Sequence, residues 1–149
     1  MTIKYEKYSP ADTVGLMEKE SIIGFLFNHL EAYGDPKADI TKCVDYALNS
    51  GNHPGGVIIS AWAGEAVIGT VVINRTGMGG YIPENILVYI ATHAGYRGQG
   101  IGKKLMEMAL EETDGDIALH VEPENPARFL YEKLGFTNKY LEMRWKRPS

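Results

Sequence analysis

The chain has 149 residues, of which 44% are hydrophobic, and a formal net charge of −4. This apolar content is enough for the core of one folded domain, so we expect a single domain over residues 1–149. The net negative charge argues against a nucleic-acid partner, which usually requires a basic surface. The lone cysteine, Cys43, excludes an internal disulfide framework and fits the reducing cytoplasm. The apolar runs are too short for a membrane span, and the polar N-terminus is unlike a signal peptide.

The N-terminal segment predicts a strand followed by a helix. Residues 2–8 alternate weakly between apolar and polar side chains, as expected of a half-exposed strand. Ser9 and Pro10 are typical of a helix start, because serine caps the helix and proline suits its first position. The helical spacing of apolar residues then continues to Leu30, with an interruption at Gly24.

A second helix and a strand hairpin come next. Asp35 and Pro36 repeat the cap-and-proline signal of a helix start. Residues 57–62 and 67–73 are rich in β-branched side chains and are expected to be strands. Gly64 begins the two-residue connection between them, which is typical of a type II′ hairpin turn.

The C-terminal half alternates strands and helices. An apolar strand over residues 86–91 leads through a glycine-rich turn into a helix over residues 100–113. Two further strands are expected over residues 117–122 and 140–146, on either side of a helix over residues 126–134.

The glycine-rich turn, Arg97-Gly98-Gln99-Gly100-Ile101-Gly102, is the most informative segment of the chain. Backbone N–H groups at a helix start have no partner within the helix, and the helix dipole adds positive potential there. Glycine lets a ligand approach that backbone closely, because it has no Cβ. The turn therefore predicts a phosphate or pyrophosphate site, to which Arg97 and Lys103 add charge.

The spacing of the turn separates several phosphate-binding families. A Walker A loop requires Ser or Thr after Gly-Lys, but Lys104 follows Lys103 here. A dinucleotide fingerprint, Gly-x-Gly-x-x-Gly, fails because Lys103 or Leu105 stands at its last glycine position. The pattern Arg-x-x-Gly-x-Gly, which runs from Arg97 to Gly102, resembles the acyl-CoA pyrophosphate loop of the GNAT (Gcn5-related) N-acetyltransferase superfamily.

A second segment, from Asn125 to Phe136, is similar to the other signature of that superfamily, which ends in Tyr-x-x-x-Gly-Phe. The two motifs occur in the family's order, and the resemblance covers residues 84–137. It implies an α/β (α+β) GNAT fold: a mixed, mostly antiparallel central sheet with helices on both faces. The implied order of elements is β-α-α-β-β-β-α-β-α-β. Because the family often has two strands at the C-terminal end, one is expected to be short or absent here.

The resemblance also implies a role for individual residues. The strand before the loop would part from its neighbour near a bulge, and its backbone would then bind the pantetheine arm and thioester of acetyl-CoA. Tyr131 would protonate the leaving thiolate. The implied cofactor-binding residues are Ile90, Ala91, Thr92, Arg97, Gly98, Gln99, Gly100, Ile101, Gly102, Lys103, Asn125 and Tyr131.

The candidate side chains outside the loop also have structural explanations. Asn125 is a good helix N-cap, and Tyr131 falls on the apolar stripe of its helix. Glu84 is the one carboxylate near the strand before the loop, so it is the candidate general base, acting through water, or else a solvated acid at the strand start. In the histone-acetylating branch of the family, the matching position is Ile86 instead.

The remaining reactive side chains point to no metal and to no covalent intermediate. His93 and His120 could lie near the ends of the central strands, but they are interpreted as structural residues, without metal-ligand spacing. Cys43 falls on the second helix, away from the glycine loop, which favours direct transfer in a ternary complex over an acyl-cysteine route.

The sequence thus predicts a cytoplasmic, metal-free N-acetyltransferase that moves an acetyl group from acetyl-CoA to a primary amine. The acceptor would be a small molecule, a peptide or a protein, with no nucleic-acid or membrane partner. A homodimer is compatible with the family. Two alternatives stay open: a non-catalytic acyl-CoA-binding or sensing module, and an unrelated α/β binding domain with a chance glycine turn.

Overall fold

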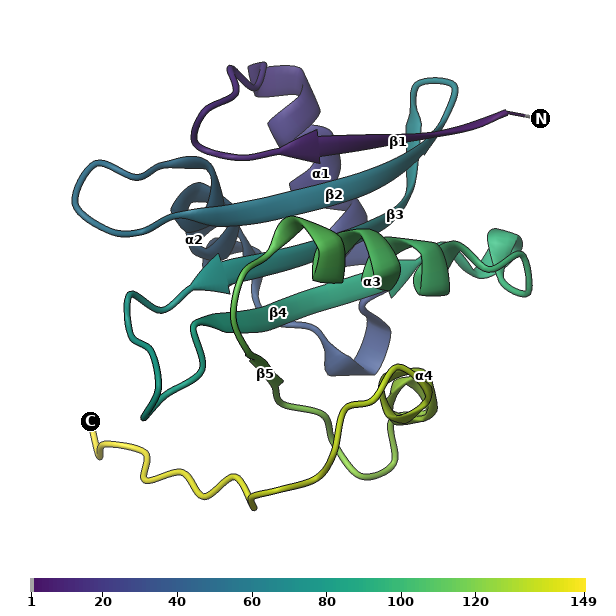
Figure 1. The fold of residues 1–149 in the computed structure, drawn as a ribbon. Helices are drawn as coiled ribbons and strands as arrows, with labels where there is room; N and C mark the ends of the chain where they lie inside the picture. Colours follow the sequence, from purple (N-terminus) through teal and green to yellow (C-terminus); the bar gives the residue numbers. More distant parts are fainter. Residues whose placement is uncertain (1) are drawn as a thin grey trace. The chain divides into compact units, whose positions relative to one another are not determined.

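The computed structural model describes residues 2–149 (Figure 1). The chain divides into two compact units, one that ends at Leu119 and one that begins at His120. The expected single domain stays a prediction. No helix in the described part of the chain has the length and hydrophobicity that a membrane span requires.

The first unit is built on a five-stranded sheet in the order β1-β2-β3-β4-β5. Its strands are β1 (Ile3–Tyr8), β2 (Gly56–Ala63), β3 (Ala66–Arg75), β4 (Asn85–Thr92) and β5 (Ile117–Leu119). Each neighbouring pair is antiparallel except β4 and β5, which are parallel. The predicted mixed, mostly antiparallel sheet is confirmed.

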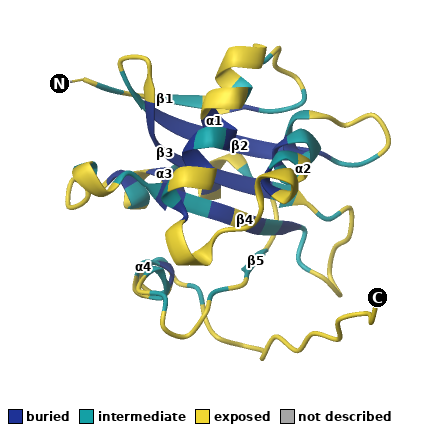
Figure 2. Ribbon diagram, turned by 180° about the vertical axis from the view of Figure 1, so that it is seen from behind, coloured by how far each residue is buried: buried dark blue, intermediate teal, exposed yellow. Residues whose placement is uncertain are grey.

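Helices cover both faces of this sheet, as expected. Figures 1 and 2 show α1 (Leu16–His29) and α2 (Lys37–Leu48) on one face and α3 (Ile101–Glu112) on the other. Short 3-10 turns precede α2 (Glu31–Tyr33) and α3 (Ala94–Tyr96). The central strands β2 and β3 are buried over most of their length because both of their faces are covered.

A close contact seats the beginning of α3 on the sheet. A Cβ added to Gly69 of β3 would lie 2.9 Å from Ile101 Cγ2 and 3.1 Å from Leu105 Cδ1. Both of these α3 side chains are fully buried. A larger residue at position 69 would therefore push away the first turn of α3, which is the turn that follows the glycine-rich loop.

The N-terminal helix differs from the prediction at its start and in its interior. Ser9 and Asp12 bond to each other, since the Ser9 N–H donates to the Asp12 carboxylate and the Asp12 N–H donates to the Ser9 carbonyl. Ser9, which was expected to cap the helix, is engaged in this turn instead, and α1 begins only at Leu16. The helix also runs through Gly24 without a break, because burial of its apolar face outweighs the cost of about 1 kcal/mol for one glycine.

The second unit contains α4 (Ala127–Lys133) and no strand. The expected strand over residues 117–122 stops at Leu119, where its pairing with β4 ends. The expected strand over residues 140–146 is absent, and that prediction was wrong. Apolar alternation alone does not make a strand, because the backbone groups need a partner strand, and no described residue pairs with this segment. Its large side chains are exposed: Tyr140, Leu141, Met143 and Trp145.

Candidate active site

The glycine-rich loop presents a row of free backbone donors at the start of α3. Among residues 2–149, no acceptor is bonded to the N–H groups of residues 98–103, and the first bonded N–H is that of Lys104, which donates to the Gly100 carbonyl. Gly98 and Gly100 have φ values of +83° and +77°, a left-handed conformation that favours glycine. A Cβ at either position would meet no atom within 4 Å, so the loop surface is open. This geometry suits an anion such as a pyrophosphate.

Two cationic side chains flank these donors. Arg97 precedes the loop and forms an exposed ion pair with Glu31, with 3.4 Å between Nη2 and Oε1. An exposed pair of this length contributes little stability, so Arg97 can exchange Glu31 for a phosphate at small cost. Lys103 lies in the first turn of α3 and forms no ion pair with a described residue. The predicted charges therefore accompany the free N–H groups.

The strand that leads to the loop has an unpaired edge. The parallel pairing of β4 with β5 covers only Asn85 to Leu87, opposite Ile117 to Leu119. In the antiparallel pairing with β3, Tyr89 lies opposite Val72 and Leu87 opposite Ile73, so Val88 is the extra residue of a bulge. β4 thus parts from β5 at Val88, next to its bulge against β3, as the resemblance implied.

The direction of the free groups follows from the ladder. The His93 N–H donates to the Ile68 carbonyl on β3 at 2.8 Å. Because neighbouring residues of an antiparallel strand alternate their N–H and C=O directions, those of Ile90 and Thr92 point away from β3, toward the unpaired edge. The side chain of Ala91 instead is buried in the core between the sheet and the helices α1 and α2. Ile90 and Thr92 can therefore offer backbone bonds to an extended, amide-rich ligand.

A tyrosine–aspartate pair beside this edge was not anticipated from the sequence. The buried Tyr89 donates its hydroxyl to Asp35 Oδ2 at 2.6 Å. Burial, followed by the hydrogen bond to Asp35, raises the pKa of Tyr89. The pair fixes the connection between α1 and α2 to the middle of β4. The sequence signal, Asp35 before Pro36, indicated only a helix start, because a contact across 54 residues leaves no local pattern.

Two histidines lie where β4 meets the loop. His93 accepts the Gly95 N–H at Nδ1, and this contact supports the predicted structural role of His93. Its ring lies 4.5 Å from that of His29, at the end of α1. Burial, followed by the charges of His93 and Arg97, lowers the pKa of His29, while Glu31 opposes the shift. His29 is a second residue near the loop that sequence reasoning missed, and His120 is exposed at the start of the second unit.

Glu84 lies one residue before β4, and its carboxylate is engaged with the backbone. Glu84 Oε1 accepts the Asp116 N–H at 2.9 Å, and this bond is the main reason that the pKa of Glu84 is lowered. The adjacent Asn85 donates its side-chain amide to the Asp114 carbonyl at 2.7 Å. Both contacts join the start of β4 to the turn before β5. These contacts favour an anchoring role for Glu84 over proton acceptance. The strand length from Glu84 to Ile90, about 20 Å over six residues, also places Glu84 far from the proposed thioester position.

We expect Glu84→Gln to lower the thermal midpoint of unfolding at pH 7 and to change the rate of any acyl transfer less than about threefold. The lowered pKa means that the Glu84 carboxylate stabilises the fold above the ordinary glutamate pKa of about 4.3 and that this contribution disappears as the pH falls through the folded-state pKa. The difference between the two proteins should therefore shrink below pH 4. Thermal melts from pH 3 to 8 measure it, and a tenfold loss of rate in a folded variant would assign Glu84 the role of base instead.

Cys43 is poorly suited to act as a nucleophile. It is half-buried on α2, where Asn74 donates an N–H to its sulfur at 3.4 Å. Burial raises the pKa of the Cys43 thiol to about 12. The reactive thiolate is therefore scarce at neutral pH, which agrees with the expectation that no acyl-cysteine forms.

In the second unit, Tyr131 and Asn125 are both placed by α4. Tyr131 is buried, and burial raises the pKa of its phenol to about 12. Asn125 Oδ1 accepts the Ala127 N–H at 2.9 Å, so Asn125 bonds the first N–H of α4 from the position before the N-cap, Pro126. Gly135, with φ of +101°, ends the helix, and the Phe136 N–H donates to the Tyr131 carbonyl across this turn.

Comparison with known proteins identifies the family. The sequence model of the acetyltransferase (GNAT) domain matches residues 54–138, which include the hairpin, the glycine loop and α4. A comparison with curated proteins finds no significant sequence match.

Solved structures of acetyltransferases share the fold. The aminoglycoside N-acetyltransferase AAC(6′)-Iy in complex with CoA has a TM-score of 0.71 at 15% identity, over 99% of this chain and 96% of the other. A GNAT-family acetyltransferase from Streptococcus pneumoniae TIGR4 has a TM-score of 0.70 at 21% identity, over 99% and 100%. The NatC complex bound to Gag peptide and CoA gives 0.72 at 22% identity, over 94% and 87%. The match to the domain model, which spans more than half of the chain, shows that the protein belongs to the GNAT acetyltransferase family.

Proposed function

We propose that the protein transfers the acetyl group of acetyl-CoA to a primary amine, directly and within a ternary complex. The observation that carries this proposal is the run of unpartnered N–H groups from Gly98 to Lys103, which follows the unpaired edge of β4. One feature suits a pyrophosphate, and the other suits an amide-rich arm that ends in a thioester. Membership of the GNAT family agrees with this pairing.

The loop and the edge of β4 would bind and orient acetyl-CoA. Residues 98–103, with Arg97, would hold the pyrophosphate of acetyl-CoA, and Asn125 would contribute its free amide group to the pantetheine arm. The backbone of Ile90 to Thr92 would orient the thioester and donate to the oxygen that becomes negative as the amine attacks. Most of the rate enhancement would come from positioning the two reactants.

The chemistry balances without a covalent enzyme intermediate. The neutral amine forms a C–N bond to the thioester carbonyl carbon, and the C–S bond then breaks. Tyr131 would give its proton to the departing thiolate, since a phenol with a raised pKa is still protonated at neutral pH. The unreactive Cys43 supports this direct route. The proton that the attacking amine loses would pass to water, because the bond of the Glu84 carboxylate to the Asp116 N–H favours an anchoring role for Glu84.

The experiment that tests the proposal is thiol release from acetyl-CoA, measured with and without a panel of primary amines that includes peptide N-termini. Release that depends on an amine is the expected result. Tight binding of acetyl-CoA without release by any amine would overturn the transferase assignment and favour an acyl-CoA-sensing module. A cytoplasmic location and a homodimer stay predictions from the sequence.

A further inference from the structure

A cavity opens on the first unit where β4 and β5 part. Its volume is about 320 Å³, near the lower end of ligand-pocket sizes. It lies at the C-terminal end of α2, on the sheet face that this helix covers. Its walls are formed by Tyr46, Asn74, Arg75, Thr76, Met78, Ile86 and Val88.

The position of the cavity links it to the proposed reaction. Val88 lines the cavity and is also the bulged residue, the first one beyond the pairing of β4 with β5. Ile90, which turns its backbone groups to the unpaired edge, is two residues further, about 7 Å along the strand. A group that fills the cavity would therefore sit next to the segment proposed to hold the thioester.

The chemistry of the walls is apolar. Met78 and Val88 line the cavity and have 42% and 37% of their surface accessible, and Ile86 of β4 lines it as a half-buried side chain. Two polar side chains of the wall are already used, because the Tyr46 hydroxyl donates to the Arg75 carbonyl at 2.7 Å and the Thr76 hydroxyl donates to the Pro83 carbonyl at 2.8 Å. The carbonyl oxygen of the Asn74 side chain has no partner among the described residues, but this atom is buried and therefore closed to a ligand. A ligand therefore meets mainly methyl, methylene and thioether groups.

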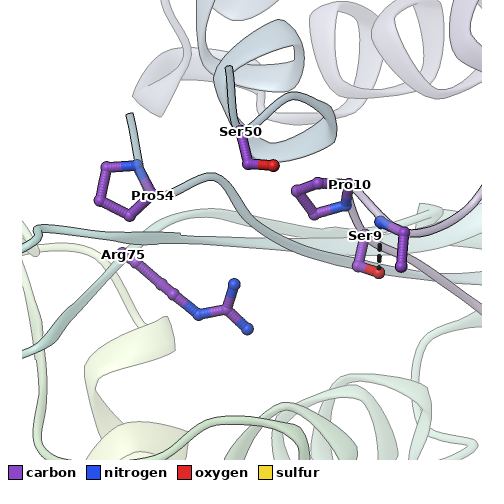
Figure 3. A pocket seen from close by; sticks show the side chains of 6 residues that line it. Ser9, Pro10, Ser50, Pro54 and Arg75 are labelled. Atoms are coloured by element: carbon purple, nitrogen blue, oxygen red, sulfur yellow. Dashed lines mark hydrogen bonds between the residues drawn. The ribbon is translucent and has the colours of Figure 1, made fainter. Parts of the chain in front are cut away.

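The walls of the cavity offer no counter-charge to a second positive charge. No carboxylate lines the cavity, and its one charged residue is Arg75. The Arg75 guanidinium lies over a neighbouring cavity of about 400 Å³, among Ser9, Pro10, Ser50 and Pro54 (Figure 3), and has no ion-pair partner among residues 2–149. An ammonium group in the apolar cavity would find no carboxylate among the residues that line it.

We propose that this cavity binds an apolar group carried beside the acceptor amine, so that the substrates are primary amines with one hydrophobic substituent and no second positive charge. The inference rests on the proposed function and names its substrate class. It predicts that polyamines and other polycationic amines are poor acceptors. A small amine and a peptide with an apolar N-terminal residue both carry an apolar group beside a primary amine, so both belong to this class.

A matched pair of amines tests the proposal. Hexylamine and 1,5-diaminopentane have the same length and differ at the far end, which is a methyl group in one and an ammonium group in the other. With the full chain and saturating acetyl-CoA, we expect kcat/KM for hexylamine to be at least tenfold higher, and to rise about threefold to fourfold per added CH2 from ethylamine to hexylamine. Peptides that begin with Met or with Lys, compared in the same way, distinguish the two sources.

Variants then locate the effect in the cavity. Val88→Asp and, as a second site on a connecting loop, Met78→Asp should each reduce the preference for hexylamine at least tenfold while the dissociation constant of acetyl-CoA stays within twofold. Tyr81→Asp adds the same charge at a residue that is 80% exposed and lies outside the cavity, and it should leave the preference unchanged.

The possible failures are distinguishable. Equal or better turnover of the diamine by the native chain would overturn the inference and leave the transferase assignment standing. A preference that neither cavity variant changes would also overturn it. Absence of thiol release with every amine would instead overturn the proposed function.

Discussion

Replacing Gly100 with valine is expected to reduce the affinity for acetyl-CoA at least 100-fold, about 2.7 kcal/mol, in a protein that still folds. Gly100 has a φ of +77° and is the residue from which α3 begins. A β-branched residue in this conformation costs about 1–2 kcal/mol. Its side chain would also stand in the open space through which the pyrophosphate reaches the N–H groups of residues 98–103. Isothermal titration calorimetry with acetyl-CoA measures the loss.

The control for this variant is a second glycine with the same φ. Gly80, in the connection between β3 and β4, also has a φ of +77° and no heavy atom within 4 Å of a Cβ. Gly80→Val should therefore impose a similar strain and a similar loss of thermal stability, yet bind acetyl-CoA as the native protein does. Native affinity in Gly100→Val would refute the assignment of the loop.

Tyr131→Phe is expected to lower kcat about 100-fold with little change in the dissociation constant of acetyl-CoA. General acid catalysis typically contributes 10²- to 10⁴-fold, and only the hydroxyl is removed. Because burial raises the pKa of Tyr131 to about 12, the phenol is protonated throughout the usual assay range. The native pH–rate profile should consequently show no alkaline loss from this group below about pH 11. Steady-state rates of thiol release measure kcat, and a separate binding titration measures the dissociation constant of acetyl-CoA.

Tyr140→Phe provides the matched control, because it removes the same hydroxyl from a side chain that is 78% exposed on the same unit. Its turnover should equal that of the native chain. If Tyr131→Phe also turned over at the native rate, Tyr131 would be a buried core residue and another donor would have to protonate the thiolate.

Local signals predicted the elements that bury a periodic apolar face. The hairpin turn at Gly64 is an example: Ala63 lies opposite Ala66, which leaves a two-residue connection, and Gly64 has a positive φ of 63°. The end of α4 at Gly135 is a further case, whereas α2 begins at Lys37 with Pro36 as its N-cap and without the predicted cap from Asp35. At both glycines, one residue type is favoured by a backbone conformation, so the sequence carries the information.

The predictions failed where a local signal allows a second structure or where a partner distant in the sequence decides it. Ser9 and Pro10 were predicted to start a helix, but Ser9 instead bonds to Asp12 in a separate turn. The segment over residues 140–146 has the alternation of a strand but finds no partner strand among the described residues. A strand is made by hydrogen bonds to another segment, and no property of the segment itself guarantees them.

The sequence by itself determined the family, the order of the central elements and the glycine-rich turn before α3, because glycine spacing and apolar periodicity are local features that a short segment can specify. Only the tertiary structure decided that β4 and β5 part at Val88, that Asp35 binds Tyr89, that Glu84 is bonded to the turn before β5, and that an apolar cavity lies at the point of parting. Each of these depends on contacts between residues far apart in the chain, and such contacts form only when the whole sheet is assembled.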